Sequence, residues 1–358
     1  MAQPLPLELY HAIIQHVDKW VDLYSLALCC SAFRDEAQRC LFRYVELHSE
    51  RRHTLFISAV NASPLRLGPL VHAFYLNSAS APRFGMEDPT APLSISLALR
   101  SMCNLEHFKN EWLLPSTILR ECTFKLRTLV WDRYLDKSSR LFLLCHFLPT
   151  QPSIRRLDLN FGESNPSDLV EVPTDLCPML DFLEVTDNNI INHLLRDDRL
   201  ITRFQWESIG GGLPTMSTRQ LNHLKYLRCV IDVLNMNPSF TLQLNSLVCL
   251  ELFRIKFLSK YLDRLMEVLQ FLQNLPRLEV LVLEETYDNI LNIPAYHHAF
   301  KLCPTLKHID ARRGGRTFYE RFFPPEDGIL ITNMRIHKRD VLGWRREYGA
   351  GPAWLNYI

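Results

Sequence analysis

The chain has 358 residues, and 47% of them are hydrophobic, which is enough to build the core of one elongated domain or of two compact ones. Its 40 Lys and Arg residues nearly balance 39 Asp and Glu residues, and a formal charge of +1 argues against a broad electrostatic surface for nucleic acid. The first residues lack the basic start and apolar run of a signal peptide, and no stretch reaches the roughly 18 apolar residues of a membrane span. We therefore expect an intracellular protein, cytoplasmic or nuclear, that binds neither nucleic acid nor membranes.

The ten cysteines are scattered along the chain without a C-x-x-C pair or a regular framework. Most lie among leucines, where cysteine behaves as a small buried hydrophobe in a reducing compartment. The sequence therefore predicts no disulfide framework and no zinc site.

Three short amphipathic helices are predicted in the first forty or so residues. Leu9, Ile13 and Val17 recur at helical spacing after the proline at position 6, which favours a helix starting there and ending near Asp18. A second apolar segment runs from Val21 to Leu28, and a third stripe runs from Cys30 to Leu41. A unit of this size buries little surface, so it needs a neighbour to cover its remaining apolar face.

The order of these residues resembles the F-box: Leu-Pro, x-Glu-Leu, Ile-Ile and Val, then Asp-Leu, Leu-x-Leu, Cys and an aromatic residue. Phe33 stands where many members of that family have tryptophan. The resemblance implies docking onto the Skp adaptor and, through it, onto a cullin. The implied adaptor-binding residues are Leu5, Pro6, Leu9, Ile13, Ile14, Leu23, Leu26 and Phe33. The alternative is an ordinary helical cap on a larger domain.

A short apolar triplet with the spacing L-x-x-L-x-L repeats through the rest of the chain. Copies begin at Val71, Leu105 (degraded), Leu126, Ile154, Leu180, Ile201, Leu224, Leu247, Leu278, Leu306 and Ile331, the last two being weaker. From Leu105 onward they begin 21 to 31 residues apart, in or just beyond the period of leucine-rich repeats. Helix-like segments separate many of the triplets, so we expect short parallel strands on one side and helices on the other.

The predicted fold class is therefore α/β, with a three-helix F-box-like module at 1–47, an irregular leucine-rich-repeat-like solenoid at 48–339 and a C-terminal cap at 340–358 that covers the open end. The combination resembles F-box proteins with divergent leucine-rich repeats, of the fungal substrate-receptor type. A general α/β domain with apparently periodic leucines is the alternative.

No catalytic, cofactor-binding or metal-binding constellation is found in the sequence. Nucleophile elbows, phosphate loops and dinucleotide or zinc motifs are absent, and Gly210 to Gly212 fit a turn better than a phosphate loop. His11 and His16 are five residues apart on the predicted first helix and lie on different faces. The chain is therefore expected to be a non-catalytic protein without cofactors.

Polar residues alternate with the leucines of the predicted strands and therefore share the face that the helices leave open. Stacked strands bring them into a mixed-charge band with aromatic residues, which suits a protein ligand as well as it suits plain solvent. The candidate target-binding residues are Arg156, Asp158, Glu184, Arg203, Gln205, Glu207, Tyr226, Arg228, Glu251 and Phe253.

The resemblance implies a substrate-recognition subunit of a Skp-cullin-F-box ubiquitin ligase that presents an unknown target protein through its repeats. Two alternatives remain. A leucine-rich-repeat scaffold or inhibitor without a ligase predicts that the first forty residues are buried against the first repeat. A hydrolase on an α/β core predicts a deep pocket with a nucleophile beside a histidine.

Overall fold

The computed structural model describes residues 6–17, 19–47, 49–77, 90–161, 173–196, 199–206, 214–231, 234, 238–253, 269–284, 293–312, 318–326, 329–337 and 341. Leu5 and Glu207 lie outside these residues, as does the 340–358 segment apart from Val341. The chain divides into two compact units, residues 1–180 and 181–358.

The first unit begins with the three expected helices, α1 (Leu7–Gln15), α2 (Trp20–Cys29) and α3 (Ser31–Arg43). Both α1 and α2 pack against α3, and Ile14, Leu23, Ala37 and Leu41 form a small buried core between them. Tyr10 of α1 meets the edge of Phe33 of α3, with ring centroids 4.7 Å apart. Because α3 runs directly into the first strand, the three helices belong to the same unit as the first repeats.

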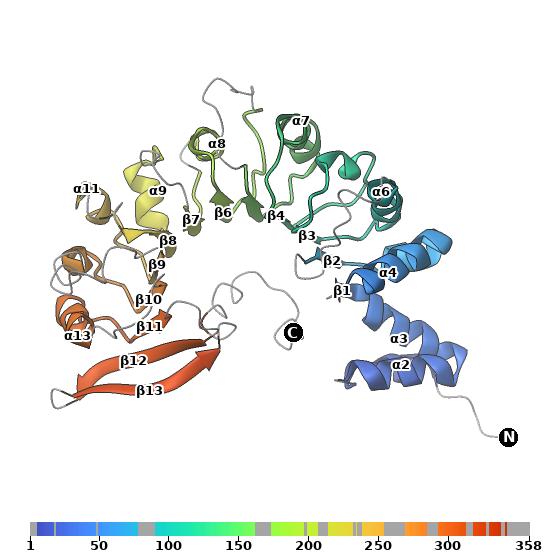
Figure 1. Cartoon of the computed structure of the whole chain (residues 1–358), viewed down its shortest axis with the longest axis horizontal. Helices are drawn as coiled ribbons and strands as arrows, with labels where there is room; N and C mark the ends of the chain where they lie inside the picture. Colours follow the sequence, from blue (N-terminus) through green and yellow to red (C-terminus); the bar gives the residue numbers. More distant parts are fainter. Residues whose placement is uncertain are drawn as a thin grey trace. The chain divides into compact units, whose positions relative to one another are not determined.

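Five parallel strands in the order β1-β2-β3-β4-β5 form the sheet of the first unit. They are β1 (Tyr44–Leu47), β2 (Ala73–Leu76), β3 (His107–Asn110), β4 (Thr128–Trp131) and β5 (Arg156–Leu159). The segments between them hold α4 (Glu50–Ala62), α5 (Pro64–Leu67), η1 (Gly68–Leu70), α6 (Ala91–Ser101), η4 (Ser116–Leu119), α7 (Lys137–Phe142), a π-helix η5 (Leu143–Phe147) and η6 (Leu148–Thr150). Figure 1 shows α4, α6 and α7 on one side of β1–β4, and we call the opposite side, which carries none of these described helices, the helix-free face.

The helix side of this sheet is closed by a row of aromatic rings that crosses from one element to the next. Phe42 of α3 lies 5.7 Å from Phe56 of α4, and Phe56 lies 5.4 Å from Phe74 of β2, measured between ring centroids. Phe74, Phe108 and Trp131 continue the row through β2, β3 and β4. Pairs at these distances add specific attraction to their burial, so the row joins the end of α3 to the repeats.

Among the described residues of the second unit, six parallel strands lie in the order β6-β7-β8-β9-β10-β11. They are β6 (Phe182–Val185), β7 (Arg203–Gln205), β8 (Tyr226–Val230), β9 (Cys249–Phe253), β10 (Val280–Glu284) and β11 (His308–Arg312). The described helices between them are α8 (Asn188–Leu194), α9 (Thr218–His223), α11 (Pro238–Thr241), η7 (Leu269–Asn274) and α13 (Ile293–Leu302). Each strand coincides with one of the predicted triplets, which confirms a mixed α/β fold with a mainly parallel sheet.

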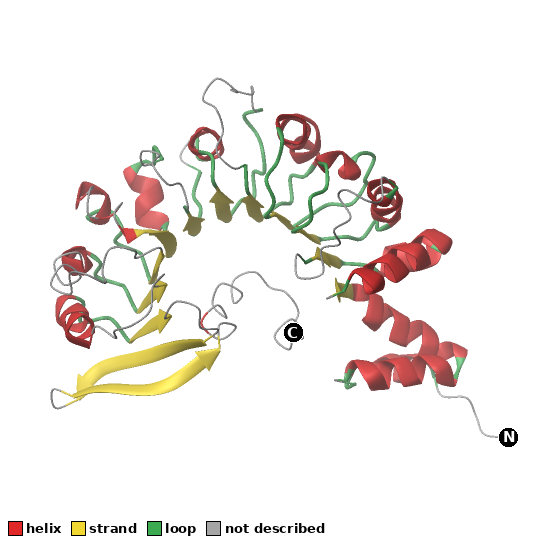
Figure 2. Ribbon diagram, in the orientation of Figure 1, coloured by secondary structure: helices red, strands yellow, loops and turns green. Residues whose placement is uncertain are grey.

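The last triplet, at Ile331, was wrongly predicted to form another parallel repeat strand. It lies in β13 (Ile329–His337), which pairs antiparallel with β12 (Phe318–Glu326), and β12 pairs antiparallel with β11. Figure 2 shows the two long strands side by side. A parallel connection needs a dozen or more residues, whereas two residues separate β12 from β13. The sequence signal that indicates this hairpin is Asp327-Gly328 between two apolar runs.

Candidate functional site

The helices α1 and α2 leave large apolar side chains exposed. Leu9 and Ile13 of α1 are 46% and 42% exposed, and Val21, Tyr24 and Leu28 of α2 are 72%, 59% and 89% exposed. The three residues of α2 are spaced i, i+3 and i+7, so they form one stripe along the helix. Two uncovered apolar stripes on a module this small mark a surface suited to a protein partner.

The eight residues predicted to bind an adaptor separate into three groups in the structure. Leu9, Ile13 and Pro6 are exposed, and Leu5 lies outside the described residues. Ile14 and Leu23 are buried in the core of the three helices, which removes them from any contact surface. Leu26 and Phe33 are half-buried and pack against that core.

The stripe at Val21, Tyr24 and Leu28 was missed from the sequence. Leu23 and Leu26 are also three residues apart on α2, so helical periodicity predicts two apolar stripes, one with these leucines and one with Val21, Tyr24 and Leu28. Periodicity alone does not tell which stripe faces α3. The structure assigns Leu23 to the core and leaves the other stripe exposed.

A second candidate surface is the helix-free face of the sheet. In the first unit we define it by the side chains of β1–β5 that alternate with those pointing to the helix side: Tyr44, Glu46, Ala73, Tyr75, His107, Lys109, Thr128, Val130, Arg156 and Asp158. Most are half-buried and polar, including Glu46, Tyr75, Lys109, Arg156 and Asp158. The Arg156 guanidinium lies 3.8 Å from the Asp158 carboxylate. This part of the face offers both signs of charge to a partner.

In the second unit, the helix-free face of the sheet is lined in register by Glu184, Gln205, Arg228, Glu251, Val282 and Asp310. Here most of the side chains are buried. Glu251 is 1% exposed and Asp310 is fully buried. Buried carboxylates are tolerated only with partners, so this face must be covered and neutralised within the chain.

Arg228 and two carboxylates form the centre of an ion-pair network on β8–β11. The Arg228 Nε atom lies 2.9 Å from Oε1 of Glu251, and its Nη2 atom donates to Oε2 of Glu284 at 3.2 Å. The Tyr226 hydroxyl donates to Glu251 at 2.6 Å, and the Tyr319 hydroxyl donates to Glu284 at 2.5 Å. The Arg228 guanidinium also lies 4.6 Å from the ring centroid of Phe253.

The hairpin strand β12 is tied to the parallel strands by a bidentate ion pair. Asp310 of β11 is opposite Arg321 of β12, and the Nε and Nη2 atoms of Arg321 each donate to a different Asp310 oxygen at 2.7 Å. His308 lies 3.6 Å from the same carboxylate, which favours the imidazolium. Burial nevertheless wins and lowers the pKa of His308, and Arg321 acts in the same direction.

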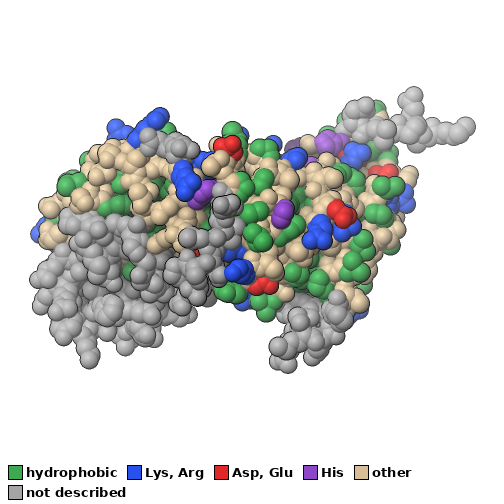
Figure 3. Space-filling model, turned by 90° about the horizontal axis from the view of Figure 1, so that it is seen from above, with side chains coloured by type: hydrophobic (Ala, Val, Ile, Leu, Met, Phe, Trp, Pro, Cys, Tyr) green, Lys and Arg blue, Asp and Glu red, His purple; other side chains and the backbone are tan. Residues whose placement is uncertain are grey.

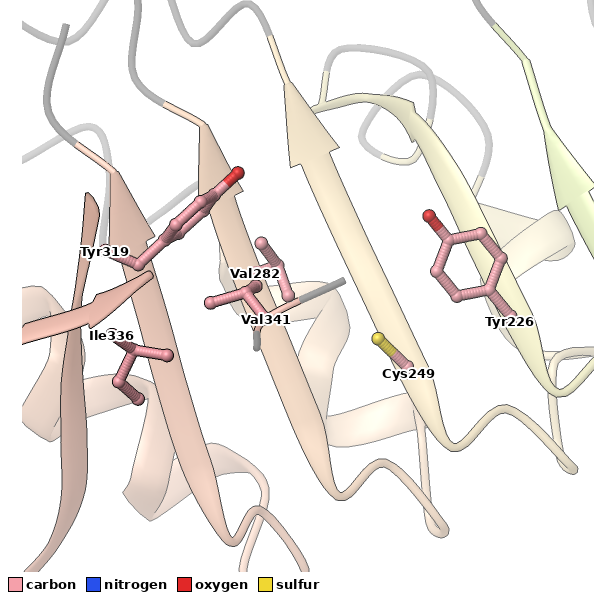
Figure 4. Close-up of a cluster of buried hydrophobic side chains, with 6 residues drawn as sticks. All are labelled: Tyr226, Cys249, Val282, Tyr319, Ile336 and Val341. Atoms are coloured by element: carbon pink, nitrogen blue, oxygen red, sulfur yellow. The ribbon is translucent and has the colours of Figure 1, made fainter. Parts of the chain in front are cut away.

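Apolar side chains fill the space beside this network. Tyr226, Cys249, Val282, Tyr319, Ile336 and Val341 form one buried cluster, drawn in Figure 4. Tyr226, Cys249 and Val282 come from β8, β9 and β10, whereas Tyr319 and Ile336 come from the hairpin. Val341 was expected within an end cap, and the structure places it in this cluster.

The predicted target-binding residues are therefore not all available for contact. Arg156, Asp158, Glu184 and Arg228 are half-buried, and Glu207 lies outside the described residues. The expectation of exposure is corrected for the five residues that are buried: Arg203, Gln205, Tyr226, Glu251 and Phe253. Gln205 donates to Glu184 across β6 and β7, so these side chains bond to each other. Whether the half-buried members bind a target stays a prediction.

Surface charges and metal ligands give no separate indication of a site. The face seen in Figure 3 shows basic, acidic and hydrophobic side chains interspersed over its coloured part. Among the described residues, no three His, Cys, Asp or Glu side chains are grouped to hold a metal ion. No helix in that part of the chain is long and apolar enough to cross a membrane.

The sequence matches no protein-family model and no curated protein. One similar solved structure is the leucine-rich repeat-containing protein LegL7 from Legionella pneumophila, with a TM-score of 0.37 and 12% sequence identity over 72% of this chain and 80% of that chain. A likeness of this size does not establish a shared fold.

Proposed function

We propose that this chain is the substrate-recognition subunit of a Skp-cullin-F-box ubiquitin ligase. In this role α1–α3 bind the Skp adaptor, which links the chain to a cullin, and the strand-and-helix repeats bind a target protein. In this role the chain needs no catalytic residues of its own. It contributes proximity, because it raises the effective concentration of target lysines beside the conjugating enzyme.

The observation that carries this proposal is the exposed apolar surface of α1 and α2, in a segment whose residue order resembles the F-box. Leu9, Ile13 and the α2 stripe together leave more apolar surface uncovered than a terminal cap needs. Burying such side chains against a partner contributes roughly 1.5–3 kcal/mol for each fully covered residue. An adaptor would supply the cover that the chain does not.

Target binding is assigned to the more open helix-free face of the first unit. Arg156 and Asp158 on β5, with Tyr75 and Lys109 on β2 and β3, combine an aromatic ring with both charges. Tyrosine and arginine are enriched at protein interfaces, and alternating charge favours specific partners over general ones. The target itself is defined only as a protein with a complementary polar surface.

The alternative is a scaffold or inhibitor that binds a protein without a ligase. It requires the first forty residues to be covered by the first repeat. The exposure of Leu9, Ile13, Val21 and Leu28 argues against that cover, so the receptor is the preferred proposal.

Co-purification of the full chain with a Skp adaptor tests the proposal. The variant Leu9→Glu, Ile13→Glu should lose the adaptor, because an unpaired carboxylate would be buried in the contact. The matched control is Leu93→Glu, Leu141→Glu, which changes two helical leucines that are 61% and 45% exposed on α6 and α7. The control should keep the adaptor. Loss in both variants, or binding by neither variant nor the parent chain, contradicts the proposal, and circular dichroism checks that each variant is folded.

A further inference from the structure

The helices on the helix side of the first unit, seen at α4 and α6 in Figure 1, expose a group of leucines that the proposed function does not use. Leu55 of α4 and Leu65 of α5 are 60% and 94% exposed, and Leu93 and Leu97 of α6 are 61% and 49% exposed. Single apolar side chains on a surface need no explanation, whereas a contiguous group marks a contact site. Whether these leucines form one surface depends on how α4 and α5 are aligned with α6.

Two contacts fix the alignment of α4 and α5 against α6. The Asn61 side chain at the end of α4 donates to the Ser94 carbonyl oxygen of α6 at 2.9 Å. Further along both segments, Gly68 lies so close to Ser101 that a Cβ atom at this position would overlap the Ser101 carbonyl oxygen. Residues between 61 and 68 therefore lie level with residues between 94 and 101.

Leu65 and Leu97 lie between these two contacts, so they are level with each other on α5 and α6. Leu93 precedes Leu97 by four residues and extends the exposed surface by one turn along α6. An exposed stripe on α4, with the spacing i, i+4 and i+7, leads up to Leu65. We call the whole surface the α4–α6 patch, and it consists of Leu55, Ala59, Ala62, Leu65, Leu93 and Leu97.

A second feature of the α4–α6 patch is the positive charge at its border. Arg51 and Arg52 lie about one turn before Leu55 on α4, and Arg66 follows Leu65 on α5. All three arginines are exposed, and none forms an ion pair with another described residue. Exposed charges without a partner attract a ligand of the opposite sign.

The sequence of the patch segments has the same sign of charge as its border. Residues 50–67 and 91–101 together hold four arginines and one glutamate, a formal charge of +3, whereas the whole chain has +1. The fourth of these arginines, Arg100 of α6, pairs with Glu121 at 2.7 Å. An acidic ligand is therefore attracted to the patch, and a second copy of the same patch would bring arginines against arginines.

We propose that the α4–α6 patch binds an amphipathic helix of a partner protein, with the apolar face of that helix on the leucines and its acidic residues toward the arginines. The patch consists of helix surfaces whose backbone groups are already bonded, so it offers no strand edge to an extended segment. A ligand that buries its backbone here has to satisfy that backbone internally, which a helix does. The patch also contains no aromatic side chain of the kind that anchors proteins at membrane interfaces, which favours a protein over a lipid surface.

Fluorescence anisotropy of the full chain with labelled peptides tests the proposal. The first peptide is a model amphipathic helix of about four turns, with leucine on one face and glutamate on the other, and the second carries lysine in place of every glutamate. The parent chain should bind the acidic peptide at least about tenfold more tightly than the basic one. Equal affinities, or no binding of the acidic peptide, would overturn the proposal.

Two double variants separate the apolar contribution from the charged one. Leu65→Glu, Leu97→Glu should weaken binding of the acidic peptide at least about tenfold, because the burial of two leucine side chains is lost. Arg52→Glu, Arg66→Glu should reverse the preference, so that the basic peptide binds more tightly. If the arginine variant kept the preference for the acidic peptide, the charged border would have no part in binding and the proposal would be wrong.

The matched control is Leu141→Glu, which changes a leucine of α7 that is 45% exposed and lies outside the patch. It should leave the affinity for both peptides unchanged, and circular dichroism checks that each variant is folded. Weakening by the control as large as in Leu65→Glu, Leu97→Glu would contradict the proposal, because any exposed leucine would then serve.

Vesicles distinguish a protein ligand from a membrane. The parent chain should not sediment with phosphatidylcholine vesicles that contain phosphatidylserine. Sedimentation that is lost in Leu65→Glu, Leu97→Glu would assign the patch to an anionic membrane and overturn the proposal. Co-purification with the Skp adaptor should be unchanged in all these variants, because α1–α3 contain no residue of the patch, so failure here is distinguishable from failure of the proposed function.

Discussion

The helix-free face differs between the two units although the helix side is built alike in both. In the first unit this face consists mainly of half-buried polar side chains, such as Tyr75, Lys109 and Asp158. In the second unit it carries a buried ion-pair network and an apolar cluster that includes hairpin residues and Val341. The strands of both units thus share the same spacing of apolar residues on the helix side. The residues that alternate with them determine whether the helix-free face is accessible to solvent or buried.

The largest expected difference between the units follows from their ion pairs. Arg321→Gln removes a bidentate partner and leaves Asp310 fully buried, so the free energy of unfolding should fall by about 3–5 kcal/mol. Arg156→Gln breaks the partly exposed pair with Asp158 in the first unit, and the change should stay within about 1 kcal/mol. Urea denaturation of both variants measures the two effects, and equal effects would contradict the contrast between the faces.

The helix-side cores should instead respond equally. Leu129 of β4 and Leu250 of β9 hold equivalent positions in their triplets, and both are fully buried. Truncation of either to alanine leaves a cavity and should lower the free energy of unfolding by about 2–5 kcal/mol. A small effect in one unit alone, measured by the same denaturation, would mean that the repeats are not packed alike.

The strands were the most predictable part of this molecule. The triplet at Leu278, for example, gives two inward side chains two residues apart, and the structure has β10 there with Leu281 and Leu283 fully buried. The triplet at Ile331 has the same spacing but lies in an antiparallel hairpin. Spacing along one strand does not encode the direction of its neighbour. The length of the connection between two strands does indicate their relative direction, and the two residues between β12 and β13 are too few for a parallel crossover.

The candidate sites were less predictable because they depend on contacts between distant residues. Alternation correctly placed Tyr226, Arg228 and Glu251 on one face. It could not show that Tyr319, Ile336 and Val341 cover part of that face, since they come from about 70 to 115 residues further along the chain. The same dependence on distant contacts holds for α2, where periodicity predicts two apolar stripes. Packing against α3 buries Leu23 and leaves Val21 exposed, and the sequence of α2 alone does not show this.

Two tyrosine hydroxyls provide a finer comparison. Tyr226→Phe removes a hydrogen bond to Glu251, a buried carboxylate, and should lower the free energy of unfolding by about 1.5–3 kcal/mol. Tyr44→Phe removes the 2.8 Å bond to Glu46 on the first unit's face, where Asn77 also donates to that carboxylate. Its effect should be about 0.5–1.5 kcal/mol. Chemical denaturation measures both variants. If Tyr44→Phe lowered the free energy of unfolding more than Tyr226→Phe, the hydrogen bonds on the second unit's face would not be the stronger ones, which contradicts the comparison.

The smallest expected effect is a pH dependence carried by one histidine in each unit. Burial lowers the pKa of His107 and of His308, and nearby Arg127 and Arg321 act in the same direction, against Glu106 and Asp310. The unfolded chain then binds protons more readily than the folded one near the ordinary pKa of about 6.5. Stability from these two groups is fully present above that pH and is lost as the pH falls through it.

Replacing either histidine with glutamine should flatten the decline in unfolding free energy between about pH 7.5 and 5.5, measured by denaturation at each pH. Because desolvation is the first cause in both cases, added salt should change the decline little, since salt screens exposed charges and not burial. If salt abolished the decline for His107 alone, the charge of the exposed Arg127, and not burial, would be its main cause. The open and buried faces would then differ in the physical origin of their pH response as well as in its size.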